Sequence, residues 1–121
     1  EKNKDSSEIR HLLNDFHDVM DANPRSIIRL ANYYTMVRST LIAERKKIDE
    51  QKIFRWLVIE DLCPEVKRLM SKAYDIKEVE AVLEDIPDPV NKENCFDLLR
   101  GTSVRFKGEI KLDEIKAIIG V

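Results

Sequence analysis

Two arginines spaced one helical turn apart are the side chains with the clearest chemical potential in this sequence. Asn23 is a preferred N-cap residue and Pro24 suits the first position of a helix, so together they predict a helix start. Arg25 and Arg29 then share one face of that helix, because residues i and i+4 lie one above the other. A helix N-terminus carries partial positive charge, which disfavours an arginine but favours an anion. Since guanidinium groups bind phosphate well, the pattern indicates a phosphate-binding site.

The same spacing has a simpler interpretation. Arg25 could form a surface ion pair with Asp21 or Asp18, and Arg29 could lie along the helix with only its stem packed. Surface pairs of this kind are common, so spacing alone favours this interpretation over a phosphate site.

Residues 23–32 resemble the Asn-Pro-Arg-x-hydrophobic-x-Arg-hydrophobic-x-Asn segment of KAP-family P-loop NTPases. More distantly, they are similar to the sensor-2 region of AAA+ ATPases, which opens a helix of the C-terminal lid. The resemblance implies a lid-like helical region in which Arg25 contacts the phosphates of a nucleotide and Arg29 supports it. Asn23 and Pro24 would hold the start of the helix that positions both arginines.

A nucleotide site of this kind needs a partner outside the present sequence. A nucleotide-binding core domain of the same chain would supply the phosphate loop, the magnesium ligands and the acid that orients water. The resemblance therefore implies ATP and Mg²⁺ in the parent protein, no cofactor in this chain alone, and no catalysis by it. The sequence begins at Glu1 without an initiator methionine, and we expect it to be a piece of a longer protein.

Two other functions remain open. The wide apolar perimeter of the helix predicted over 24–46, together with Trp56 lying off its neighbours' apolar stripe, is typical of a helical protein–protein interaction module with no nucleotide role. Such a module could also self-associate. The segment 91–121 has a local basic bias that would suit a DNA-binding helix-turn-helix, although acidic residues interrupt it. The basic side chains concerned are Arg100, Arg105, Lys107, Lys111 and Lys116.

Other catalytic and metal-binding patterns are missing from the sequence. It contains no Walker A loop, no G-x-S-x-G and no H-E-x-x-H. His11 and His17 are six residues apart on one predicted helix and do not share a face, so we expect surface positions for both. Asp15 and Asp18 could hold a cation only with further oxygen ligands, which the sequence does not supply. We therefore expect no metal site.

Charge and composition limit the classes of function and the cellular location that we expect. The 121 residues have a formal net charge of −2, which disfavours a dedicated nucleic-acid binder. No apolar stretch approaches the roughly 20 residues needed to span a bilayer. Cys63 and Cys95 cannot form a disulfide framework and are expected to be small core residues, which fits a reducing, cytoplasmic location.

The pattern of apolar residues predicts an all-α fold: a single helical domain over residues 1–121 with six to seven helices. An Asp-led capping box at residues 5–8 opens the first helix, and further helices are expected from residues 24, 49, 64, 75, 91 and 112. Gly101 fits a left-handed helix stop. A short β-hairpin near 104–110 is the only β candidate, and the weakest internal joint lies near 86–90, where Pro87 and Pro89 restrict the backbone.

Overall fold

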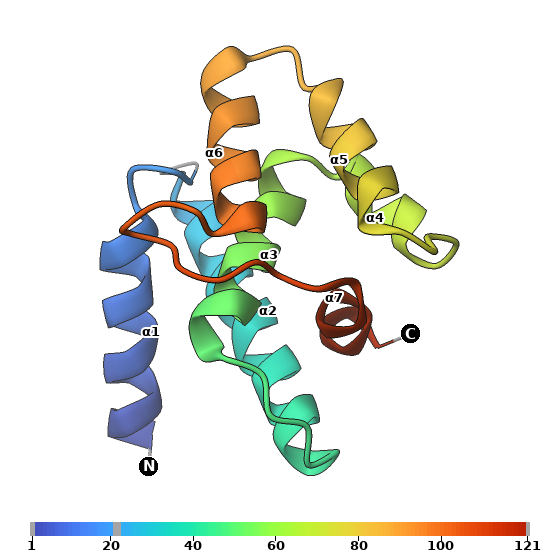
Figure 1. The fold of residues 1–121 in the computed structure, drawn as a ribbon. Coiled ribbons are helices and arrows are strands. Elements are labelled where there is room, and N and C mark those ends of the chain that lie inside the picture. Colours follow the sequence, from blue (N-terminus) through green and yellow to red (C-terminus); the bar gives the residue numbers. More distant parts are fainter. Residues whose placement is uncertain (1, 21–22, 121) are drawn as a thin grey trace.

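The structure, a computed structural model, describes residues 2–20 and 23–120, and these residues form an all-α bundle (Figure 1). No strand occurs among them, so the predicted fold class is confirmed. The helices in chain order are α1 (Lys2–Phe16), α2 (Pro24–Ala43), α3 (Glu50–Leu62), α4 (Glu65–Met70), α5 (Ile76–Glu84), α6 (Pro89–Arg100) and α7 (Leu112–Ile119).

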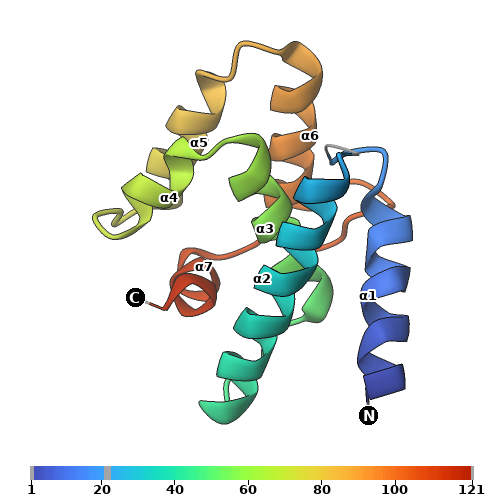
Figure 2. The same ribbon diagram turned by 180° about the vertical axis from the view of Figure 1, so that it is seen from behind.

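Helix α3 forms the centre of the bundle, with α2 packed on one side and α6 on another (Figures 1 and 2). Every residue from Ile53 to Glu60 is buried. A helix that is covered all round belongs to the core rather than to the surface. Trp56, for which the sequence favoured the boundary of the core and left a partly exposed interface as the alternative, is fully buried, because α3 has neighbours on several sides instead of one.

Aromatic rings connect the N-terminal helix to the rest of the core. The Phe16 ring of α1 lies 5.0 Å from the ring of Phe54 on α3 and 5.0 Å from Phe106, which follows α6. Tyr34 of α2 meets Phe54 edge-on at 5.6 Å. Ring pairs at these distances add to the free energy gained from burial alone. One buried hydrophobic cluster includes residues from all these helices.

Local sequence signals set most helix ends. The side chains of Asn23, Asp49 and Asp88 each accept a hydrogen bond from a first-turn N–H, and Asp75 forms a complete capping box with Glu78. These bonds satisfy donors that a helix start would otherwise leave unpaired. The start of α2, which carries the two arginines, is thus fixed by its own residues.

Three predicted boundaries are wrong. Helix α1 begins at Lys2, so Asp5 lies inside it rather than at its cap. Residues 2–4 are also helical, so the capping pattern at 5–8 does not mark the start of the helix. The predicted β-hairpin is reduced to one bridge between Thr102 and Lys107, because the segment packs through Phe106 rather than by strand pairing. Helix α6 begins at Pro89 rather than at the predicted residue 91, because the Asp88 side chain caps it by accepting from the first-turn N–H groups.

Candidate functional site

The start of α2 has the geometry that the sequence predicts. The Asn23 Oδ1 accepts a hydrogen bond of 2.9 Å from the backbone N–H of Arg25, and Pro24 occupies the first helical position. The main-chain carbonyl of Asn23 accepts the next bond, from Ile27 at 3.0 Å. Arg25 is exposed, and its side chain forms no ion pair with any residue in 9–20 or 23–120.

Arg29, one turn further along α2, is engaged by the neighbouring helix. Its Nη2 lies 2.7 Å from Oδ1 of Asp61 near the end of α3. The Asp61 side chain is only 9 % exposed, whereas the Arg29 side chain is 69 % exposed. The pair therefore ties the first turns of α2 to α3 while leaving much of the guanidinium accessible. The two predicted arginines share a face of α2, but Arg29 has an ion-pair partner and Arg25 has none among the described residues.

A surface cavity of about 450 Å³ adjoins this pair and reaches the first turn of α6. Arg29, Asp61 and the buried Ser26 line it on the α2 and α3 side, and Asn91 and Asn94 line it on the α6 side. The N-termini of α2 and α6 thus approach the same cavity, which places two positive helix ends near each other. Asp18 also lines the cavity and Arg25 does not, so the lining combines two carboxylates with one guanidinium and polar side chains.

Two acidic residues, Asp18 and Asp21, were considered as surface ion-pair partners of Arg25. Asp18 does not pair with Arg25, because it forms a two-point ion pair with Arg105 from the segment after α6. Asp21 lies outside the described residues. The Arg105 guanidinium also contacts the main-chain oxygen of Asp15. Asp15 and Asp18, for which no metal site was expected, thus lie beside a guanidinium of the same chain, Asp18 through its carboxylate and Asp15 through its main-chain oxygen.

Sequence reasoning missed a buried polar cluster beneath Arg29. Glu60 is 7 % exposed, and neither its Oε2 nor the Nε1 of Trp56 has a hydrogen-bond partner among the described residues. Burial raises the pKa of Glu60, and Lys67, Trp56 and Tyr33 oppose part of that rise. A cavity of about 280 Å³ lies against Glu60, Tyr33 and Lys67. The four apolar residues 56–59 directly before Glu60 were the available signal, because consecutive apolar residues on a helix indicate burial on several sides.

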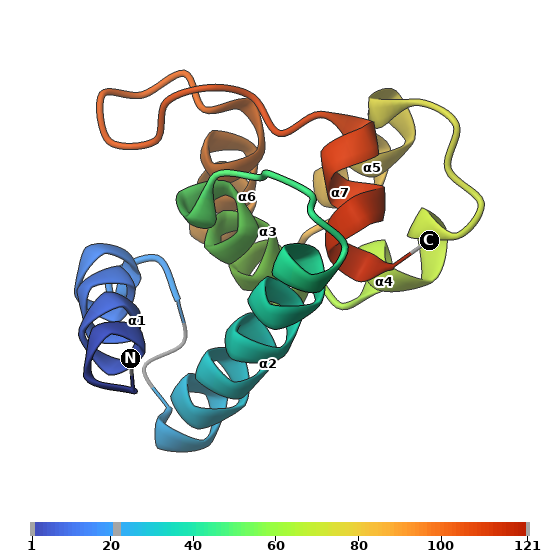
Figure 3. The ribbon, with the colours of Figure 1, turned by 90° about the horizontal axis from the view of Figure 1, so that it is seen from below.

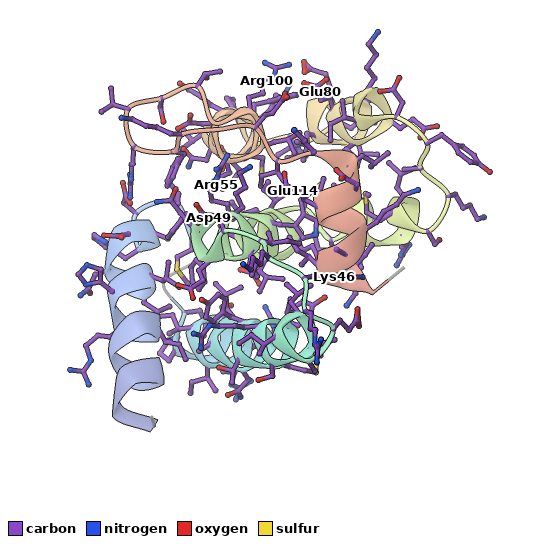
Figure 4. The ribbon with its side chains drawn as sticks, turned by 60° about the horizontal axis from the view of Figure 1, so that its bottom comes forward. Lys46, Asp49, Arg55, Glu80, Arg100 and Glu114 are labelled. Atoms are coloured by element: carbon purple, nitrogen blue, oxygen red, sulfur yellow. The ribbon has the colours of Figure 1, made fainter. Side chains whose placement is uncertain are left out.

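A second buried charge, Arg55, was also missed. Figure 4 shows it on the side of α3 that faces α6 and the following segment. Its Nε donates to the carbonyl of Leu98 at 2.8 Å, and its other nitrogens donate to the carbonyls of Lys107 and Gly108 at 3.3 and 2.9 Å. Burial lowers the pKa of Arg55, and nearby carboxylates offset part of this effect. Arg55 therefore holds the end of α6 in place and is structural rather than a binding residue.

The other residues considered from the sequence do not contribute to the candidate site. His11 and His17 are exposed, and Cys63 and Cys95 are buried free thiols, as expected. Helices α6 and α7 are separated by residues 101–111, which is too long for the turn of a helix-turn-helix of roughly 3–4 residues. Within the described part of the chain, no three metal-binding side chains gather. Nor is any described helix both long and apolar enough to cross a bilayer.

Comparison of the chain with protein-family models, with curated proteins and with solved structures finds no match in any of the three.

Proposed function

We propose that this chain is a lid-like helical region of a P-loop NTPase of the KAP and AAA+ type, non-catalytic alone, in which Arg25 binds the nucleotide phosphates. The observation that carries the proposal is the contrast between the two arginines. Asp61 engages Arg29, whereas Arg25 sits exposed in the first turn of α2 without an ion pair in the described residues. A cation at the positive end of a helix is unfavourable by itself and is stabilised when an anion binds there.

The two arginines have separate roles in this proposal. Arg25 donates charge-assisted hydrogen bonds to β- or γ-phosphate oxygens and stabilises the charge that develops during phosphoryl transfer. Arg29 is a positioning residue, because its bond to Asp61 couples the first turns of α2 to the buried helix α3. ATP, Mg²⁺ and the phosphate loop belong to a core domain of the same chain, in a cytoplasmic protein.

The test uses the intact protein of which this chain is part. Arg25→Ala should lower ATP turnover by about 10²–10³-fold, which is the usual cost of removing one transition-state donor. Arg25→Lys should recover only part of this loss, since Lys lacks the two-point geometry of Arg. Arg68→Ala is the matched control, because Arg68 is also an exposed helical arginine but lies in the last turn of α4.

Normal turnover in Arg25→Ala would overturn the assignment. So would an open reading frame that encodes no G-x-x-x-x-G-K-[ST] loop in the same protein.

A second candidate function is a helical protein–protein interaction module without a nucleotide role. The observation that favours it is the exposure of Ile28, Met36 and Ile42, three large apolar side chains on α2 that are 59–62 % exposed. Under this alternative, Arg25→Ala leaves ATP turnover unchanged, whereas polar substitutions of the three apolar residues abolish association with a partner.

A further inference from the structure

Helix α2 presents an outward face that combines apolar and basic side chains. Figures 2 and 3 show α2 along one edge of the molecule, with α3 packed behind it. Ile28, Met36 and Ile42 fall within about 120° of one another around the helix axis, so they share this face. Together with Arg45 and Lys47, which follow the end of α2, they are called here the α2 outer face.

The charge of this segment is opposite to that of the rest of the chain. Residues 24–47 contain six Lys and Arg side chains and one Glu, whereas the remainder contains 15 Lys and Arg against 22 Asp and Glu. Three of the six cations have internal partners: Arg29 with Asp61, Arg38 with Glu50, and Lys46 with Glu44. Arg45 and Lys47 are exposed and have no ion pair among the described residues.

Arg45 also occupies a backbone position that suits glycine. Its φ is +59°, in the left-handed region. The N–H of Lys46 bonds to the carbonyl of Leu41, and that of Arg45 to Ile42, which is the hydrogen-bonding pattern of a Schellman helix end. Glycine is preferred at this position because a Cβ costs about 1 kcal/mol there. Arg45 is thus a strained residue whose exposed cation lies directly after the end of α2.

The composition of the face indicates which class of partner it fits. Polar Asn32, Thr35 and Ser39 lie between the apolar residues, so the face lacks the continuous apolar stripe of a helix that lies in a membrane interface. It exposes no aromatic platform for bases, since Tyr33 is partly buried beneath Lys67. A mixture of apolar, polar and basic side chains is ordinary for a protein interface.

A second copy of the chain fits poorly. Arginines lie near the start of α2, and Arg45, Lys46 and Lys47 follow its end, so both ends are basic. In a parallel pair of α2 helices, each basic end would lie beside the same basic end of the second copy. In an antiparallel pair, the start of one helix would lie beside the end of the other, and both are basic. Either arrangement places like charges in contact and is disfavoured.

We propose that the α2 outer face docks an acidic amphipathic segment of a protein partner, whose aliphatic side chains cover Ile28, Met36 and Ile42 and whose carboxylates meet Arg45 and Lys47. This inference goes beyond the nucleotide proposal and holds whether or not Arg25 contacts phosphate. A helix about 30 Å long and about 10 Å wide offers a footprint well below the ~800 Å² per partner of stable complexes. The association is therefore weak, fast and sensitive to salt.

The test measures binding of the full chain to a labelled synthetic helix with leucine on one face and glutamate on the other, by fluorescence anisotropy. Added salt should weaken binding about tenfold or more. The variant Lys47→Glu and the double variant Met36→Ser/Ile42→Ser should each weaken binding by a similar factor. Arg45→Gly is the decisive variant: it should raise the melting temperature by relieving the left-handed strain and at the same time weaken binding. Lys77→Glu and Val104→Ser are matched controls, since both residues are exposed but lie elsewhere, and they should bind normally.

Four outcomes would overturn the proposal. They are no binding of the acidic helix, equal binding of its lysine counterpart, preferential binding to phosphatidylcholine–phosphatidylserine vesicles, and a dimer in light scattering that Met36→Ser/Ile42→Ser dissolves. Circular dichroism of each variant establishes that a loss of binding does not come from unfolding.

Discussion

At the scale of single residues, the buried carboxylate of Glu60 is the clearest source of instability in the fold. Its carboxylate is buried beside Trp56 with one oxygen unpaired in the described structure. Because burial raises the pKa of Glu60, folding disfavours the ionised carboxylate. The stability associated with this group is present in full below its unfolded pKa, near 4.3, and is lost as the pH rises through the folded-state value.

Glu60→Gln should therefore raise the melting temperature by a few degrees at neutral pH, since the amide has no charge to desolvate. The gain should shrink as the pH falls toward 4, where Glu60 itself becomes neutral. Thermal unfolding of both proteins across this pH range checks the prediction. An equal loss of stability in Glu60→Gln at every pH would mean that the carboxylate is required as an acceptor.

Asp18 shows the opposite electrostatic behaviour. Hydrogen bonds from Arg105 lower the pKa of Asp18 from 3.8 to about 2. Arg105→Ala should return this pKa toward 3.8, as measured by NMR titration of the Asp18 carboxyl carbon. The stability that the pair contributes is present above the unfolded pKa and is lost as the pH falls toward 2.

The effect of that pair on stability is small, because both side chains are at least 42 % exposed and solvent screens the interaction. Arg10→Ala is a suitable control, since Arg10 is also exposed on α1. A pKa of Asp18 that stays near 2 in Arg105→Ala would contradict the assigned cause.

At the scale of elements, the end of α6 depends on a close approach of two glycines. Gly101 has a φ of +60°, and a Cβ on it would lie 2.1 Å from the main-chain oxygen of Gly108. The same region receives the buried guanidinium of Arg55. Three parts of the chain therefore meet at a point with no room for a side chain.

Gly101→Ala should destabilise the fold by about 2–4 kcal/mol, from the left-handed backbone strain and the steric overlap together. Gly120→Ala separates the two causes, because Gly120 has a φ of +84° but nothing within 4 Å of its added Cβ. That variant should cost only about 1 kcal/mol. Urea denaturation of both variants measures the difference, and equal losses would contradict the steric explanation.

The helix ends were the most predictable feature of the sequence. The caps at Asn23 and Asp75 and the stop at Gly101 follow from interactions within a few residues, so local types and spacing are sufficient to find them. The predicted helix start at Asp5 was wrong, because a capping pattern shows where a helix can start and this helix starts earlier. The hairpin near 104–110 failed because packing of Phe106 against Phe16 decides that segment.

At the scale of the whole molecule, the unpredictable features are those made by distant parts of the chain. The carbonyl partners of Arg55 come from Leu98 and beyond, and Asp61 meets Arg29 only when α2 and α3 pack together. Spacing along the sequence cannot supply such contacts. It placed the arginines on one face but could not show that Asp61 engages one of them.

The central claim is that Arg25 binds the phosphates of a nucleotide held by the rest of the protein. The most direct measurement is the affinity of the intact protein for ATP, determined by isothermal titration calorimetry for the native sequence and for Arg25→Ala. We expect the substitution to weaken ATP binding by about tenfold or more, while Arg68→Ala leaves it unchanged. Equal ATP affinity in all three proteins, or an intact protein that binds no ATP, would contradict the account.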